Sequence, residues 1–276
     1  MSEIHTPENI KINVLQYLEQ KKAEQEASIK AQEELIASSA YQNELKFIQR
    51  ITSDAIILLH IFLTYSTREG EFSHNSLTIR STSDLGESIF AASHLVEQGL
   101  INPIKRELRY MIENLVKTLY VDQHAKKQKS LMLLTERLTF LEKNVNSSSI
   151  DIRKNLQLAA LSLDNEKQLV NEINNLYRDC CAYVHVSRKQ IDERLSLAER
   201  GRSFGFETPE ELRKIGRLMF RVYDVVLTLY LHSNLITTGD IFIQILDEQP
   251  KWKFHKGKYI SLVSKYFDYK FERQNR

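Results

Sequence analysis

The sequence has few of the residues that interrupt helices. Its 276 residues include four Pro and eight Gly. This shortage, together with plentiful Leu, Ile, Glu, Lys and Gln, argues against a sheet built on many tight turns and favours long helices. We therefore expect an all-α fold.

Cysteine is also scarce, which argues against a disulfide framework or a thiolate metal site. Cys180 and Cys181 are neighbours on one expected helix, where a bridge would be badly strained and a metal would lack further thiolates. The sequence has no HExxH or CxxC spacing, no Walker-type or GxGxxG loop and no serine nucleophile elbow. We therefore expect no metal and no cofactor.

A strong charge imbalance and a long apolar run are missing too. The longest apolar run, "AIILL" before His60, is too short to span a bilayer, and the polar start "MSEIHTPENI" does not resemble a signal peptide. We expect a soluble, cytoplasmic protein with no membrane partner. The 38 Lys and Arg nearly balance the 36 Asp and Glu, for a net charge of +2. Residues 251–276 nevertheless carry a net +6, which leaves a net −4 on the rest of the chain.

Three regions follow from the pattern along the chain. Residues 1–40 form an N-terminal helical arm that starts at Thr6-Pro7-Glu8 and becomes highly charged, so it either packs on a partner or is simply solvated. Residues 41–235 form a helical bundle, and residues 236–276 form a basic, aromatic helical extension.

Within the bundle, we expect a loop at 66–76 because of its Gly and Ser content. Two strongly amphipathic helices, over 103–122 and 165–200, should pack side by side.

The C-terminal extension interleaves lysines with aromatic residues. Aromatic rings flanked by cations can hold single-stranded RNA by stacking, and the candidate contacts are Lys251, Trp252, Lys253, Lys256 and Lys258. We favour the alternative, a helix over 256–271 whose aromatics pack on the bundle while its lysines stay in solvent.

Arg178 and His185 lie seven residues apart in the stretch "LYRDCCAYVHVSRKQIDERL". On a continuous helix this spacing places them within ~20° of each other and roughly 10.5 Å apart along the axis. They lie off the apolar seam, as polar residues do on any amphipathic surface helix. The seam consists of Leu169, Ile173, Tyr177, Cys180, Val184, Ile191 and Leu195. A similar Arg-to-His spacing, Arg68 to His74, falls in the expected loop.

The segment "YRDCCAYVH" resembles the Arg-x4-6-His motif of the HEPN superfamily, in which a polar residue, here Asp179, commonly follows the Arg. Upstream, "GLINPIKRELRYMIENLVKTLYVD" is similar to a helix of uncharacterised bacterial HEPN-like families with an Arg-x3-Glu pattern before a "YVH-x-S" element. The matching residues are Arg109, Glu113, Tyr183, His185 and Ser187. The resemblance covers roughly residues 84–235.

The resemblance implies a bundle of four or five helices that often dimerises. Active members of the superfamily are metal-independent ribonucleases with Arg and His at the dimer cleft, whereas many relatives are binding or scaffold modules. By this resemblance Arg178 contacts the phosphate, His185 is the general acid or base, and Asp179 orients a neighbour. This chain has six residues between Arg and His, including the bulky Tyr183 and Val184.

Arg109 and Glu113 have two interpretations. An exposed Arg–Glu pair four residues apart on a helix contributes only a few tenths of a kcal/mol. Alternatively, the pair faces Arg178 and His185 and completes a polar cluster between helices.

Our leading hypothesis is a HEPN-like endoribonuclease that acts on RNA as a toxin or anti-phage defence effector. We expect it to be a homodimer or to be held by a protein partner such as an antitoxin. A catalytically silent helical scaffold in a larger defence or regulatory assembly is the second hypothesis, and a regulatory nucleotide-binding module is the third. The charged arm and the Arg/His stripe both suggest symmetric self-association.

Overall fold

The computed structural model describes residues 7–127, 133–145, 155–181, 187–199, 205–206, 208–246 and 249–267. These residues contain helices and no strand, which confirms the all-α class. The helices are α1 (Pro7–Ala37), α2 (Ser39–Ser66), α3 (Gly70–Asn75), α4 (Leu77–Arg80), α5 (Thr82–Glu97), α6 (Ile101–Ala125), α7 (Leu134–Asn144), α9 (Leu163–Cys181), α10 (Arg188–Glu199), α11 (Pro209–Leu231), α12 (Leu235–Gln244), the 3₁₀ helix η3 (Lys253–Lys256) and α13 (Ile260–Tyr266).

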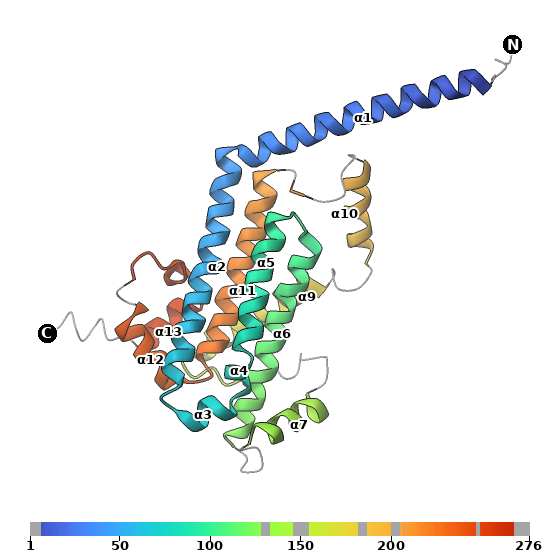
Figure 1. Ribbon diagram of the computed structural model, residues 1–276. Coiled ribbons are helices and arrows are strands. Elements are labelled where there is room, and N and C mark those ends of the chain that lie inside the picture. The colour runs from blue at the N-terminus through green and yellow to red at the C-terminus, as the bar shows by residue number, and fades with distance from the viewer. Residues whose placement is uncertain are drawn as a thin grey trace.

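Five long helices, α2, α5, α6, α9 and α11, form a bundle around one hydrophobic core (Figure 1). Helices α2 and α11 run in the same direction, because Arg213 pairs with Glu44 near their starts and Tyr230 packs on Phe62 near their ends. Helix α5 returns in the opposite direction and turns into α6 at Gly99, whose φ of 68° favours glycine. The prediction that the helices beginning near 103 and 165 pack side by side is confirmed for α6 and α9.

The prediction of one continuous helix over 165–200 is wrong, because the chain forms two helices there. Ser187 is not helical, and its hydroxyl accepts a hydrogen bond from the Gln190 N–H at 3.2 Å, so it caps a new helix, α10. The apolar seam also changes character, since Ile191 and Leu195 on α10 are 46% and 55% exposed. Helices α9 and α10 are accordingly separate in Figure 1.

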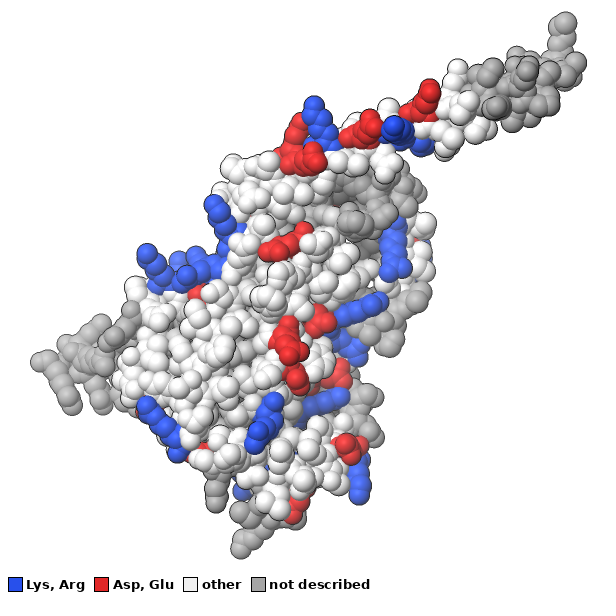
Figure 2. Space-filling model, viewed as in Figure 1, with Lys and Arg blue, Asp and Glu red and all other residues white. Residues whose placement is uncertain are grey.

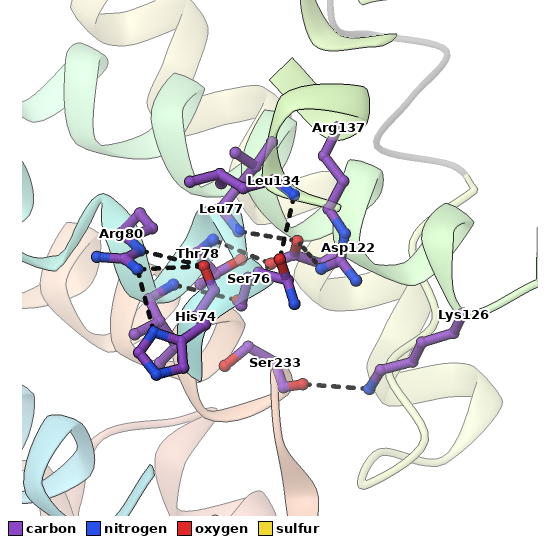
Figure 3. Close-up of polar contacts among 12 residues, drawn as sticks. His74, Ser76, Leu77, Thr78, Arg80, Asp122, Lys126, Leu134, Arg137 and Ser233 are labelled. Atoms are coloured by element: carbon purple, nitrogen blue, oxygen red, sulfur yellow. Dashed lines mark hydrogen bonds and ion pairs between the residues drawn. The ribbon is translucent and has the colours of Figure 1, made fainter. Parts of the chain in front are cut away.

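The prediction of a loop at 66–76 is also wrong, because the chain forms α3 there and continues directly into α4. Asp122, on α6 and 2% exposed, accepts hydrogen bonds from the backbone N–H groups of Leu77 and Thr78, both at 2.9 Å. It also accepts from the Ser76 hydroxyl at 2.6 Å and from Arg137 of α7 at 2.9 Å (Figure 3). A buried carboxylate thus supplies the partners that the start of α4 lacks.

Helix α1 leaves the bundle as a single long rod (Figure 1). Leu35 near its end packs against the core, whereas six large apolar residues along it are exposed: Val14, Leu15, Tyr17, Leu18, Ile29 and Ile36. The bundle contacts it near its end, where the Gln32 amide donates to the Phe206 carbonyl at 3.4 Å. Most of the described part of α1 therefore projects away from the bundle (Figure 1).

Helix α2 is, among the described helices, the one long and apolar enough to cross a membrane. Of the 18-residue stretch of α2 with the highest mean hydropathy, 44% is buried inside the fold. Its apolar residues pack against α5 and α11.

The C-terminal extension shares the core of the bundle. Asp54 of α2, 1% exposed, accepts a hydrogen bond from the Lys253 N–H at 2.7 Å, and its carbonyl accepts from the Trp252 indole at 3.1 Å. Asp224 of α11 accepts from the N–H groups of Tyr259 and Ile260, both at 3.0 Å. The boundary expected at residue 235 therefore does not separate two cores.

Candidate functional site at the α6–α9 contact

Arg109 and Glu113 lie between α6 and α9 rather than on an exposed helix face. The Arg109 Nη2 donates to the Tyr177 hydroxyl at 3.0 Å and lies 3.6 Å from Glu113 Oε2. Lys117 pairs with the other oxygen of Glu113 at 2.6 Å. The Arg109 and Glu113 side chains are 18% and 22% exposed, so this is a half-buried network and not the solvated pair considered above.

The Arg109 guanidinium is held in its charged form. Burial opposes the charge, but the hydrogen bond to Tyr177 and the neighbouring Cys181 and Glu113 outweigh it and raise the pKa of Arg109. Its charged group lies 5.0 Å from the centre of the Tyr177 ring, within cation–π range. Burial also raises the pKa of Tyr177. The network therefore keeps a fixed positive charge beside the last turns of α9.

Arg178 follows Tyr177 in α9, and its side-chain hydrogen bond does not go to this network. It is exposed, and its Nη2 donates to the side-chain oxygen of Asn175 at 2.9 Å. Asp179 is exposed as well. The polar cluster at the α6–α9 contact thus brings Arg109 and Glu113 to Tyr177, and not to Arg178.

Tyr183 and His185 lie outside the described residues. The geometry expected for Arg178 and His185 assumed an unbroken helix, and the chain is no longer helical at Ser187. Their convergence on one site stays a prediction.

The favoured interpretation of the C-terminal segment holds in part: within its range Tyr259 is buried and Phe267 packs on the core, but Tyr266 is 56% exposed. Trp252 is 2% exposed and Phe254 is fully buried, so neither ring is available to stack on a base, and the stacking role considered for Trp252 is wrong. Lys251, Lys253, Lys256 and Lys258 are exposed. The helix expected at 256–271 is shorter, since the described chain forms η3 and then α13.

Sequence reasoning missed the part played by Tyr177, which was assigned to the apolar seam. Its ring does pack against the core, but its hydroxyl accepts the Arg109 hydrogen bond. A Tyr at the edge of an amphipathic face, opposite an Arg on a neighbouring helix, is the signal that could have indicated this contact. Within the described ranges, no group of three or more His, Cys, Asp or Glu side chains is arranged to hold a metal ion.

No protein-family model, no curated protein and no solved structure matches the chain. The resemblance to the HEPN superfamily rests on the motif residues given above.

Proposed function

We propose that the protein is a cytoplasmic, metal-independent endoribonuclease in which Arg178 contacts the scissile phosphate and His185 transfers the proton. The observation that carries the proposal is the state of Arg178. Its guanidinium is exposed at the end of α9 and bonds the neutral amide of Asn175. Among the described residues no carboxylate pairs with it, so its charge is available to a phosphate.

The proposed reaction uses RNA's own nucleophile. His185 as a neutral imidazole takes the proton from a ribose 2′-hydroxyl, and the 2′-oxygen attacks the adjacent phosphorus. The bond to the 5′-oxygen breaks, that oxygen receives a proton, and a 2′,3′-cyclic phosphate is left. Arg178 stabilises the extra negative charge on the phosphoryl oxygens in the transition state.

The Arg109 network supports this assignment indirectly. Because Arg109 holds Tyr177 through both its hydroxyl and its ring, it fixes the turn of α9 that carries Arg178. We infer that Arg109 and Glu113 position the end of α9 and do not touch the substrate.

The test is cleavage of labelled RNA by the purified protein. Arg178→Ala and His185→Ala should each lower the cleavage rate on the order of 10²-fold or more. Arg178 is exposed, so Arg178→Ala should leave the melting temperature nearly unchanged. Cleavage should persist in EDTA, yield a 2′,3′-cyclic phosphate and fail on DNA, which lacks the attacking hydroxyl.

The chain offers a matched control in Arg68 and His74, which have a similar spacing. Both are exposed, and His74 accepts the Arg80 hydrogen bonds mainly through its backbone carbonyl, at 3.2 and 3.3 Å. Arg68→Ala and His74→Ala should therefore cleave like wild type. If His185→Ala also cleaves like wild type, the assignment is wrong. A role as a toxin or anti-phage effector further requires that expression of the wild type, but not of His185→Ala, arrests growth or blocks phage.

A helical interaction module is the second candidate, and α1 favours it. Helices in proteins gain most of their stability from packing an apolar face, yet most of the large apolar residues described on α1 face solvent in the single chain. A second copy or a partner protein that packs on α1 would bury them. Sedimentation of the full chain against a chain lacking residues 1–37 tests this role, which predicts a loss of assembly on deletion.

A further inference from the structure

One face of the molecule gathers exposed cations from segments far apart in the sequence. Helix α11 contributes two of them and the segment after α12 contributes four. These six residues, called the basic face below, are Lys214, Arg217, Lys251, Lys253, Lys256 and Lys258. Figure 2 shows Lys and Arg side chains grouped at the edge of the molecule beside α2.

The basic face is continuous because the C-terminal segment crosses α11. The Trp252 indole donates a hydrogen bond to the Asp54 carbonyl of α2. The Phe254 ring stacks on the Phe220 ring of α11, with 5.2 Å between the ring centres. Further along, the Tyr259 hydroxyl donates to the Gln168 carbonyl of α9 at 3.1 Å. The segment therefore runs from α2 over α11 to α9, and Phe220 places it less than one turn along α11 from Arg217.

The cations of the basic face are not neutralised by the acids near them. Neighbouring arginines are paired: Arg213 bonds Glu44 at 2.7 Å, and Arg221 bonds Glu172 at 2.7 Å. For the six residues of the basic face, by contrast, no ion pair with a described carboxylate occurs. A group of carboxylates lies instead around Tyr110. Burial, followed by the charges of Asp84, Glu107 and Glu87, raises the pKa of the Tyr110 phenol.

The end of α9 that carries Arg178 lies at the same height along the bundle as the α11 part of the basic face. Helices α9 and α11 are antiparallel, since Gln168 contacts the segment bound by Asp224, and Glu172 pairs with Arg221. Arg217 lies one turn before Arg221 on α11. Because the helices are antiparallel, Arg217 lies at the same height along the bundle axis as position 176 on α9, one turn after Glu172. Arg178 and Lys214 lie within about a turn of that level.

We propose that the basic face binds the phosphate backbone of an RNA strand and leads it to Arg178. The identity of the anion rests on the proposed function. Trp252, Phe254 and Tyr259 are buried among these lysines, so binding works through charge and not through stacking on these rings. It is therefore insensitive to base sequence and strongly dependent on salt.

The test measures RNA binding apart from cleavage. Each variant is made in the His185→Ala background and titrated with a fluorescent, unstructured RNA oligonucleotide over a range of salt concentrations. Replacing Lys214, Lys253 and Lys256 together by Glu should weaken binding by about tenfold or more, and the slope of log K against log salt should become less steep by about 2, since each single-strand contact contributes about 0.7. The matched control replaces the exposed Lys30, Lys127 and Lys143 by Glu, which makes the same change in net charge and should leave affinity near that of the wild type.

Several outcomes would overturn the inference. It fails if the two triple variants bind alike, or if the unmodified face binds no RNA at low salt. Binding to vesicles containing phosphatidylserine in place of RNA would identify a membrane surface instead. If circular dichroism shows that the Glu variant is unfolded, the corresponding Gln variant, with half the charge change, takes its place.

A cleavage assay separates this inference from the proposed chemistry. With His185 restored, the basic-face variant should lose activity on the oligonucleotide and retain it on a dinucleotide, which is too short to reach the lysines. If no RNA is cleaved but the binding results hold, the catalytic proposal fails and the RNA-binding face stands.

Discussion

Two buried titratable groups should give the folding stability of this protein opposite dependences on pH. Burial raises the pKa of Asp224 to about 6, against the backbone N–H groups of Tyr259, Ile260 and Lys258, which lower it. Burial lowers the pKa of His232 to about 4, against its hydrogen bond to the Thr228 carbonyl. The two groups are 4% exposed each, so water screens neither.

Asp224 makes the protein less stable as pH rises. Its carboxyl group ionises near pH 3.8 in the unfolded chain and near 6 in the folded one, so the folded state binds more protons between these values. One pH unit of difference corresponds to about 1.4 kcal/mol. The free energy of unfolding should therefore fall by about 3 kcal/mol between pH 4 and pH 6 on account of Asp224.

His232 has the opposite effect. The unfolded chain protonates it near pH 6.5 and the folded chain near 4, so the unfolded state binds more protons in that range. By the same conversion its contribution to stability rises by about 3 kcal/mol as pH increases from 4 to 6.5. The two effects nearly cancel, and the wild type should show little pH dependence from this pair.

Urea unfolding followed by circular dichroism from pH 4 to pH 8 checks this balance. Asp224→Asn should show stability rising with pH relative to wild type, because His232 is then unopposed. His232→Asn, which keeps a donor for the Thr228 carbonyl, should show stability falling with pH. The difference in slope between variant and wild type is the readout, so other titrating groups cancel. Variants with wild-type slopes would refute the reasoning.

Other substitutions probe the fold and the site. Asp122→Ala should lower the free energy of unfolding by about 3–5 kcal/mol in urea titrations, since it removes one member of a buried ion pair and the acceptor of the Leu77 and Thr78 N–H groups, and adding Arg137→Met should recover part of the loss. Tyr177→Phe should cost about 1 kcal/mol by the same assay, because it removes the acceptor for Arg109 but keeps the ring. Removal of residues 1–37 should leave the melting temperature of the bundle nearly unchanged; a large drop would show that α1 belongs to the core.

The sequence predicted the features that depend on local composition and periodicity. Few Pro and Gly and a clear 3.6-residue pattern indicated the helices, and the apolar faces of α6 and α9 indicated that the two pack together. The start of α11 follows from Thr208, whose hydroxyl accepts from the Glu211 N–H at 3.2 Å, and from Pro209 after it. Burial of Tyr259 beside exposed lysines was likewise expected.

The break between α9 and α10 was missed because the hydrophobic pattern continues through it. Val184, Ile191 and Leu195 extend the seam of α9 in sequence, so periodicity alone favours one helix. Ser187 was the available signal, since Ser is a preferred N-cap and Gln190 follows three residues later, the arrangement of a capping box. The candidate site was affected directly, because the expected relation of Arg178 to His185 depended on that continuity.

Three single acids in apolar stretches of the sequence mark places where another chain segment ends against the bundle. Asp54, Asp122 and Asp224 lie in "TSDAIILL", "LYVDQH" and "RVYDVVL", and each is buried on a long helix of the bundle. Each accepts one or two backbone N–H groups at or near the start of a short helix, respectively η3, α4 and α13. A charge in the core needs such partners, so an isolated Asp on an apolar helix face predicts that another chain segment ends against it. For Asp54 and Asp224 that segment bears the lysines of the basic face, and their carboxylates therefore fix these cations in place before any anion binds.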